Sequence, residues 1–395
     1  MEIRILNDSE VVQQKQLMRY AFEPHSNNYE KLEDTTNYFS PATHIGIFDG
    51  DILASTLTVI HYSQRIRGIH FPMAGIAGVA TKPEYKHRHL VRRLFEKTFG
   101  LCHKDPAFFM PISSLYPFKF SYYEKFGYSW VDDLTFITSW LDDVIQCPPT
   151  GHVIEEEKNY EQAIVRARGI YRRFSQLFNG LIDRDKTLNA FERRLDKGFF
   201  FFCKDLTGTD TGYIVIWFVE EDTMGIREFV SLDMETRQTL WNFVARQEGH
   251  RKYFKIIDYH PHSIQTYPYL KEPRVYKSEF RPNSMLRIVD VRRLLEGLTY
   301  PPIIDSVEFR ILDDMCNWNE GPWQLRIENI KGRLLQISTS TSDVILDIKG
   351  LAQLVAGYKT TDELKEQALV KGDAIEISKF DSIFPKNPFI LRDFF

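Results

Sequence analysis

Apolar residues along the first 140 positions alternate between the spacing of helices and that of strands. Residues 10–22 carry apolar side chains at helical spacing, and on that face only Gln14 interrupts them. Two apolar stretches then meet at Asp49-Gly50, a dipeptide typical of hairpin turns. The remaining expected elements are a short strand-like segment at 65–81, an amphipathic helix within 82–104, a strand at 107–113, a helix at 118–126 stopped by Gly127, and a strand at 128–140.

This order predicts an antiparallel meander that leads into one strand–helix–strand unit. A crossover of that kind joins parallel strands, so we expect an α+β sandwich with a parallel pair near its end. A second block follows a predicted linker at 147–151 and repeats the layout without close sequence similarity. Its expected elements are helices at 160–176 and near 186–194, strands at 200–204, 212–219 and 224–232, a helix at 236–248 and a strand at 253–259.

A third block begins near Met285 and again mixes strands with helices. Alternating strands are predicted within 309–338, and a strand with a helix ended by Gly357 follows. Turns are expected at Asp313-Asp314, Asn319-Glu320-Gly321 and Lys331-Gly332. The predicted fold class is therefore α+β (mixed α/β), with domains at 1–146, 147–283 and 284–395.

Composition narrows the class of protein. The 395 residues are 43% hydrophobic and 26% charged, which is typical of a globular chain, and the length suits about two to three domains. A net charge of -4 argues against a nucleic-acid partner. The four cysteines form no CxxC pair, which predicts no metal site and a reducing cytoplasm. Without an apolar leader or an 18-residue apolar run, we expect a soluble cytoplasmic protein with no membrane span.

The segment 78–97 carries the clearest chemical signal. A predicted strand ends at Thr81, a basic turn follows, and an amphipathic helix begins. Free N–H groups at a helix N-terminus bind anions, and Lys86, Arg88 and Arg92 add positive charge there. The pattern suits a phosphate-bearing cofactor, and equally an ordinary solvated basic helix end.

Two motifs make this segment resemble a known family. Val79-Ala80, the following Pro83 and the basic turn before a helix are similar to the acetyl-coenzyme-A loop of the GNAT acetyltransferases. Residues 115–128 resemble the segment that bears the catalytic tyrosine in the enhanced intracellular survival (Eis) type of GNAT N-acetyltransferase. Members of that type have two tandem GNAT domains and a sterol-carrier-like C-terminal domain, and residues 285–295, 343–358 and the final Phe-Phe resemble the last of these. The second block lacks a phosphate-loop pattern and is expected to be a degenerate GNAT-like domain.

The resemblance implies a role for each matching position. Tyr123 matches the tyrosine that protonates the departing thiolate, and the terminal carboxylate of Phe395 is implied to reach the active site of the first domain. The family's splayed strand pairs with the pantetheine arm of acetyl-coenzyme A, and its loop holds the pyrophosphate. The matching strand positions are Val79, Ala80 and Thr81, and the matching loop positions are Lys86, His87, Arg88, His89, Leu90 and Val91.

One departure concerns the loop, which in the family contains a glycine where this chain has His89. Glycine lets backbone N–H groups approach the pyrophosphate, so the change either weakens coenzyme A binding or supplies an imidazole that donates to phosphate. Glu124 is an alternative base, although it points roughly 100° away from Tyr123 on a helix. His260 and His262 have no partner spacing that supports a metal and are expected in a solvated turn.

The resemblance implies an acetyl-coenzyme-A-dependent N-acetyltransferase that transfers acetyl directly to a primary amine of an aminoglycoside, polyamine or lysine-like acceptor. It also implies a homo-oligomer, with hexamers known among relatives. The alternative is a weak or inactive GNAT pair that binds a lipid or other hydrophobic ligand in its sterol-carrier-like domain. The missing loop glycine favours the alternative, whereas the Tyr123 segment and the Phe395 ending favour the enzyme.

Overall fold

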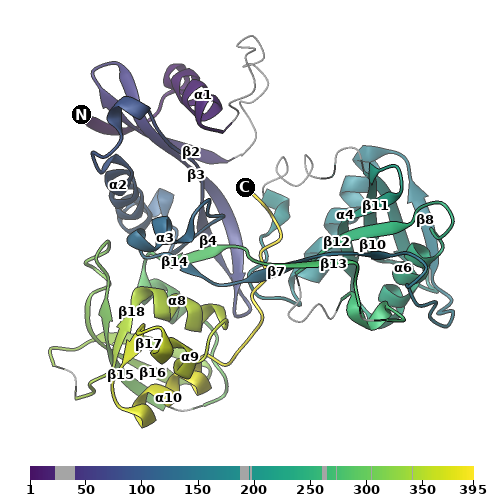
Figure 1. Cartoon of the computed structure of the whole chain (residues 1–395). Helices are drawn as coiled ribbons and strands as arrows, with labels where there is room; N and C mark the ends of the chain where they lie inside the picture. The colour runs from purple at the N-terminus through teal and green to yellow at the C-terminus, as the bar shows by residue number, and fades with distance from the viewer. Residues whose placement is uncertain are drawn as a thin grey trace. The chain divides into compact units, whose positions relative to one another are not determined.

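The computed structural model describes residues 1–22, 41–186, 195, 198–259, 265–272, 274–303, 305–339 and 341–395. The chain forms two compact units (Figure 1). The first unit holds Met1–Val131, Ser284–Phe389 and Phe394–Phe395, and the second holds Asp132–Asn283 and Ile390–Asp393. Helices pack on sheets throughout the described part of the chain, and the expected α+β fold class is confirmed. No helix in these ranges is long and apolar enough to cross a membrane.

The first unit contains a mixed sheet in the order β1-β2-β3-β4-β5-β14-β6. The expected hairpin joins β2 to β3 with Gly50 at φ 59°, and α2 carries the chain from β4 to the parallel strand β5. The elements are β1 (Glu2–Ile5), α1 (Asp8–Phe22), β2 (Ala42–Asp49), β3 (Ile52–Ile66), β4 (Ile69–Thr81), α2 (Leu90–Lys104), β5 (Ile112–Leu115), α3 (Phe120–Tyr123), β6 (Ser129–Trp130) and β14 (Met285–Ile288).

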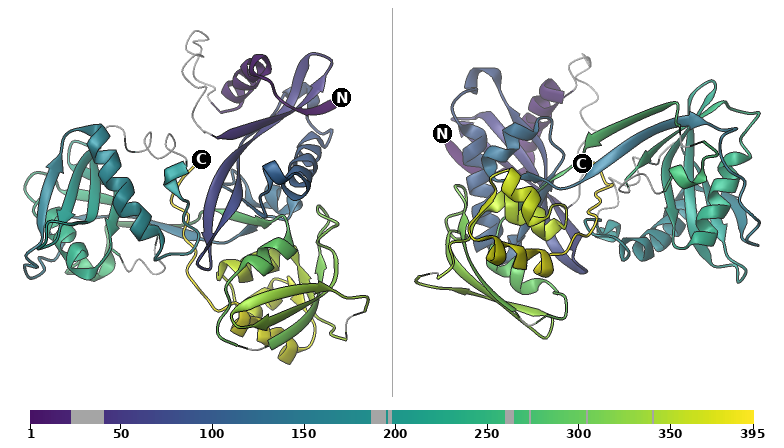
Figure 2. Two further views of the ribbon diagram at one scale, coloured as in Figure 1. Left: turned by 180° about the vertical axis from the view of Figure 1, so that it is seen from behind. Right: turned by 60° about the horizontal axis from the view of Figure 1, so that its bottom comes forward.

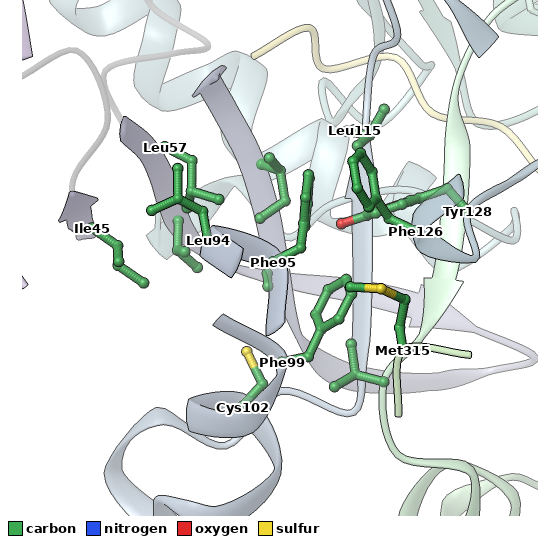
Figure 3. Packing of buried hydrophobic residues seen from close by; sticks show 14 of the residues in the cluster. Ile45, Leu57, Leu94, Phe95, Phe99, Cys102, Leu115, Phe126, Tyr128 and Met315 are labelled. Carbon is green, nitrogen blue, oxygen red and sulfur yellow. The ribbon is translucent and has the colours of Figure 1, made fainter. Parts of the chain in front are cut away.

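The helices α1 and α2 cover opposite faces of this sheet. Successive strand residues point to opposite faces, and residues 56–59 of β3 follow this alternation. Gln14 of α1 donates to the hydroxyls of Thr56 and Thr58, whereas Leu57 and Val59 belong to the main core cluster with Phe95 of α2 (Figure 3). Gln14, expected to interrupt an apolar face, is therefore the buried polar contact of α1 with the sheet.

The second unit repeats the arrangement in a sheet ordered β13-β7-β12-β11-β10-β9-β8. The strands β11 and β12 run parallel across α6, as β4 and β5 do across α2. The elements are β7 (Asp133–Trp140), β8 (Val153–Glu157), α4 (Tyr160–Ser175), β9 (Phe199–Lys204), β10 (Asp210–Glu220), β11 (Thr223–Ser231), α6 (Met234–Ala245), β12 (Tyr253–Asp258) and β13 (Lys277–Pro282). The helix expected near 186–194 falls largely outside the described residues, as do His260 and His262.

The third domain lies within the first unit and has a sheet ordered β17-β16-β15-β18-β19. Its helices α8, α9 and α10 gather on one side of this sheet (Figure 2). Arg67, in the turn between β3 and β4, donates to the carbonyls of Leu354 and Val355 at the C-terminus of α8, where a cation is favourable. The elements are α7 (Val291–Gly297), β15 (Asp305–Leu312), β16 (Gly321–Glu328), β17 (Lys331–Gln336), β18 (Ile345–Asp347), α8 (Ile348–Ala356), α9 (Thr361–Glu366), β19 (Val370–Lys371) and α10 (Ala374–Ile383).

Three sequence expectations about strands are corrected. Residues 65–81 are not one short strand: β3 continues to Ile66, turns at Arg67-Gly68 with φ of 46° and 89°, and returns as β4. Residues 128–140 divide at Val131 into β6 and β7, which belong to different sheets. The hairpin turn expected at Lys331-Gly332 lies at Asn329-Ile330, where both residues have positive φ. Strand pairing depends on tertiary contacts, so it could not be predicted from the local spacing of apolar residues.

Candidate active site

The end of β4 presents an open backbone edge. The parallel strand β5 pairs with β4 only from Met73 to Gly75, and in the described residues the part of β4 beyond Gly75 pairs with β3 alone. Gly78 bulges there at φ 57°, and a Cβ on it would lie 2.7 Å from the Cε atom of Met18. This splayed edge is a backbone surface to which an extended ligand can hydrogen-bond, because its peptide groups have no neighbouring strand.

The loop after β4 turns through two left-handed residues although it has no glycine. His87 and His89 both have positive φ, 63° and 56°, in the left-handed region that favours glycine. His89 is the N-cap residue of α2 and makes no side-chain capping hydrogen bond. The first-turn N–H groups of α2 are therefore left for a ligand, and the helix dipole favours an anion there.

A pocket of about 800 Å³ joins the open strand edge to this loop. All six predicted loop residues line it, together with Val79 and Thr81 of the strand. Ala80 does not: its side chain is buried in the cluster that contains Leu17 of α1. The structure thus brings together eight of the nine residues predicted to bind the cofactor, and Ala80 does not line the pocket.

The basic side chains of the pocket are held by their neighbours. Arg88 donates to the carbonyl of Glu84 and lies over the ring of Tyr85, with its Cζ atom 4.9 Å from the ring centre. Arg92 forms an ion pair with Glu96 one turn along α2. These contacts orient the guanidinium groups, which reduces the entropy lost when they bind a phosphate.

The predicted catalytic tyrosine is buried beside the pocket. Tyr123 ends α3, and the chain then makes a 3-10 turn that Gly127 stops at φ 80°. The ring of Tyr123 packs edge-on against Phe95, Phe118 and Tyr128, and its hydroxyl has no hydrogen-bond partner among the described residues. Burial raises the pKa of Tyr123 well above its ordinary value, so the phenol stays protonated.

The last residue packs where β4 and β5 diverge. Phe395 is only 8% exposed, and its ring lies 4.9 Å from Tyr62 and 5.3 Å from Tyr116. A Cβ on Gly75, the last residue of β4 that pairs with β5, would lie 3.2 Å from this ring. Ring contacts among the described residues do not include a direct pair of Phe395 and Tyr123.

Sequence reasoning missed several pocket residues. Phe118 and Tyr122 flank Tyr123 and line the pocket, but the aromatic-rich segment gave no signal for which ring faces outward. Asp314 also lines it, although the sequence indicated only a turn at a strand edge. Glu124, the alternative base, is exposed and does not line the pocket.

Comparisons with known families confirm the domain order. Residues 2–131 and residues 169–288 each match an acetyltransferase (GNAT) domain, and residues 291–392 match the sterol carrier protein domain. The chain therefore contains two GNAT acetyltransferase domains followed by a sterol-carrier domain, and the expected enzyme class is confirmed. GNAT domains take acetyl-coenzyme A as the acetyl donor. No curated protein sequence matches the chain significantly.

Solved structures share this fold over the full length. A conserved protein of unknown function from Enterococcus faecalis, described as a probable N-acyltransferase, is 22% identical with a TM-score of 0.89, over 100% of this chain and 99% of that one. A GCN5-related N-acetyltransferase from Anabaena variabilis is 22% identical with a TM-score of 0.86, over 100% of both chains. Eis1 from Mycobacterium abscessus is 16% identical with a TM-score of 0.81, over 100% of both chains.

Replacing His89 with glycine and, separately, with alanine tests the strain in the loop. Both changes remove the imidazole, but only glycine removes the cost of a left-handed backbone at a residue with a Cβ. We expect the free energy of unfolding of His89→Gly to exceed that of His89→Ala by about 1 kcal/mol in denaturant titrations. Equal stabilities would contradict the left-handed conformation of this residue.

Proposed function

We propose that this protein transfers the acetyl group of acetyl-coenzyme A to a primary amine of a small molecule, in a ternary complex and without a covalent enzyme intermediate. The observation that supports the proposal most is the pocket in which the open edge of β4 meets the basic loop and the uncapped N-terminus of α2. An extended thiol arm suits the strand edge, and a pyrophosphate suits the helix end.

The chemistry requires one proton donor and one proton acceptor. The neutral amine attacks the thioester carbonyl, a C–N bond forms, and the C–S bond then breaks. In this proposal the Tyr123 hydroxyl, kept protonated by burial, gives its proton to the departing thiolate. The terminal carboxylate of Phe395 accepts the proton of the amine, directly or through water. Each role is worth on the order of 10²–10⁴ in rate.

The resemblance to Eis-type enzymes extends the proposal to the acceptor and the assembly. We propose an aminoglycoside, a polyamine or a lysine-like amine as acceptor, and a cytoplasmic homo-oligomer in which the hexamer is the form to test first. No metal and no nucleic acid take part in the proposed reaction. A screen of these three amine classes, with release of free coenzyme A thiol as the readout, tests the activity. Absence of thiol release with every class would favour the lipid-binding alternative.

Binding of the donor is tested first in the wild-type protein. A ligand that binds only the native state at 100 times its Kd stabilises that state by about 2.7 kcal/mol, so acetyl-coenzyme A should raise the melting temperature. An unchanged melting temperature at millimolar acetyl-coenzyme A would contradict the proposed function.

The two pocket arginines should dominate the electrostatic part of donor binding. We expect the double variant Arg88→Ala and Arg92→Ala to weaken acetyl-coenzyme A by at least about tenfold in calorimetry, because charge-assisted contacts to phosphate are lost. The matched control removes two charges from the same helix outside the pocket, by Arg93→Ala and Lys97→Ala. Equal losses in both double variants would mean that only net charge matters.

A further inference from the structure

The turn between β15 and β16, residues 313–320, is fixed from inside by Asp313. The carboxylate of Asp313 accepts both hydrogen bonds of the Arg287 Nη2 atom, at 2.6 and 2.8 Å. It also accepts from the backbone N–H groups of Met315 and Cys316, each at 3.1 Å, and from the side-chain amide of Asn319. A carboxylate with this many donors holds the turn in a single conformation.

Arg287 connects this turn to the tyrosine segment of the first domain. It belongs to β14, which lies between β5 and β6 in the first sheet, and its side chain is 0% exposed. Its guanidinium lies directly against Gly127, since a Cβ there would be 2.6 Å from the Nη1 atom. The residue that stops the Tyr123 segment and the residue that fixes the 313–320 turn therefore touch the same buried cation.

The same turn packs along α2, the helix whose N-terminus borders the pocket. Trp318 stacks on His103 with ring centres 4.5 Å apart and planes 6° apart. Met315 joins the core cluster with Phe99 and Tyr128 (Figure 3). The turn therefore contacts the first domain through two side chains, Met315 and Trp318.

Asp314 is the residue of the turn that lines the pocket. Its carbonyl accepts a hydrogen bond of 3.1 Å from the Nη2 atom of Arg92. Its own side chain is exposed, among pocket-lining residues whose other charged groups are basic: Lys86, Arg88, Arg92 and Lys125. A third-domain residue therefore holds one phosphate-binding arginine and adds a single negative charge to a basic pocket.

We infer that the sterol-carrier domain is a working part of the donor site: Asp314, on its 313–320 turn, lines the pocket, and the Asp314 carboxylate weakens the binding of coenzyme A. The inference rests on the proposed function, because it takes coenzyme A as the occupant. Coenzyme A carries several negative phosphate charges, and a carboxylate that lines the same pocket opposes binding of both donor and product. Moderate product affinity favours turnover where release limits the rate.

Two substitutions at Asp314 and one at a neighbour test this. Asp314→Asn removes the charge without changing shape, and Asp314→Lys reverses it. We expect the Kd of coenzyme A at low salt to fall about threefold for Asp314→Asn and about tenfold for Asp314→Lys, and both gains to shrink in 0.5 M salt (roughly a 4 Å screening length). Asn317→Lys, on the same turn but outside the pocket, changes net charge by one and should bind as wild type does.

The outcomes distinguish a failure of this inference from a failure of the proposed function on which it rests. If the wild-type protein binds coenzyme A and the Asp314 variants match the Asn317→Lys control, or bind more weakly than wild type, the role of the turn is wrong and the proposed function stands. If the wild-type protein binds no coenzyme A in calorimetry, the proposed function itself fails, and this inference fails with it.

Discussion

Tyr123→Phe is expected to lower kcat about 10²-fold or more and to leave the Kd of acetyl-coenzyme A nearly unchanged. The change removes one oxygen and keeps the ring that packs against Phe95 and Tyr128, so the fold is preserved. The lost proton donor affects only the step in which the thiolate departs. Steady-state kinetics and calorimetry on the same preparation provide both numbers.

Tyr122→Phe is the matched control for this prediction. Tyr122 is the adjacent tyrosine, it lines the pocket, and it is only half-buried. Its hydroxyl has no place in the proposed reaction, so kcat should stay within a few-fold of wild type. Full activity in Tyr123→Phe would leave Tyr123 as a packing residue, and a loss confined to Tyr122→Phe would move the proton donor by one position.

A Gly-Ser extension after Phe395 is expected to abolish acetylation and to leave acetyl-coenzyme A binding largely intact. The extension keeps both terminal rings but moves the carboxylate, and loss of a general base costs on the order of 10²–10⁴ in rate. Deletion of Phe395 should have the same effect on kcat, because it removes the ring packed on Tyr62 and Tyr116 along with the carboxylate.

Phe394→Ala supplies the comparison, because it leaves the terminal carboxylate in place. Phe394 is 67% exposed and touches Tyr116 at a ring distance of 4.8 Å, so its truncation should change kcat little. Wild-type turnover in the extended protein would exclude the Phe395 carboxylate as the base. A side-chain carboxylate or a water molecule would then have to accept the proton of the amine.

The pocket could be predicted from the sequence where the signal is local. A strand end, a basic turn and an amphipathic helix lie within twenty residues, so the motif that resembles a donor loop contains nearly its whole geometry. The left-handed backbone at His87 and His89 was not predicted, although the family's glycine at the position of His89 was a signal for positive φ there.

The buried contacts of the 313–320 turn, in contrast, could not be predicted from the sequence. Asp313-Asp314 has the composition of an exposed turn, and the sequence indicated nothing more. Asp313 is buried because Arg287, 26 residues earlier and on a strand of the first sheet, neutralises it. Such a pair is visible only after the sheet order is known, since β14 lies between strands of a different domain.

The position of β14 also determines which truncated versions of this protein keep the first sheet complete. Residues 285–288 are the only strand neighbours of β6 in the described part of the chain, and they bridge it to β5. A chain shortened after residue 146 would keep the whole donor loop and Tyr123 but would lose the interior strand of its own sheet and the cation against Gly127. The first domain expressed alone, which is the usual approach for tandem proteins, would therefore lack one strand of its own sheet. A substitution in the full-length chain is the sounder way to assign roles to its parts.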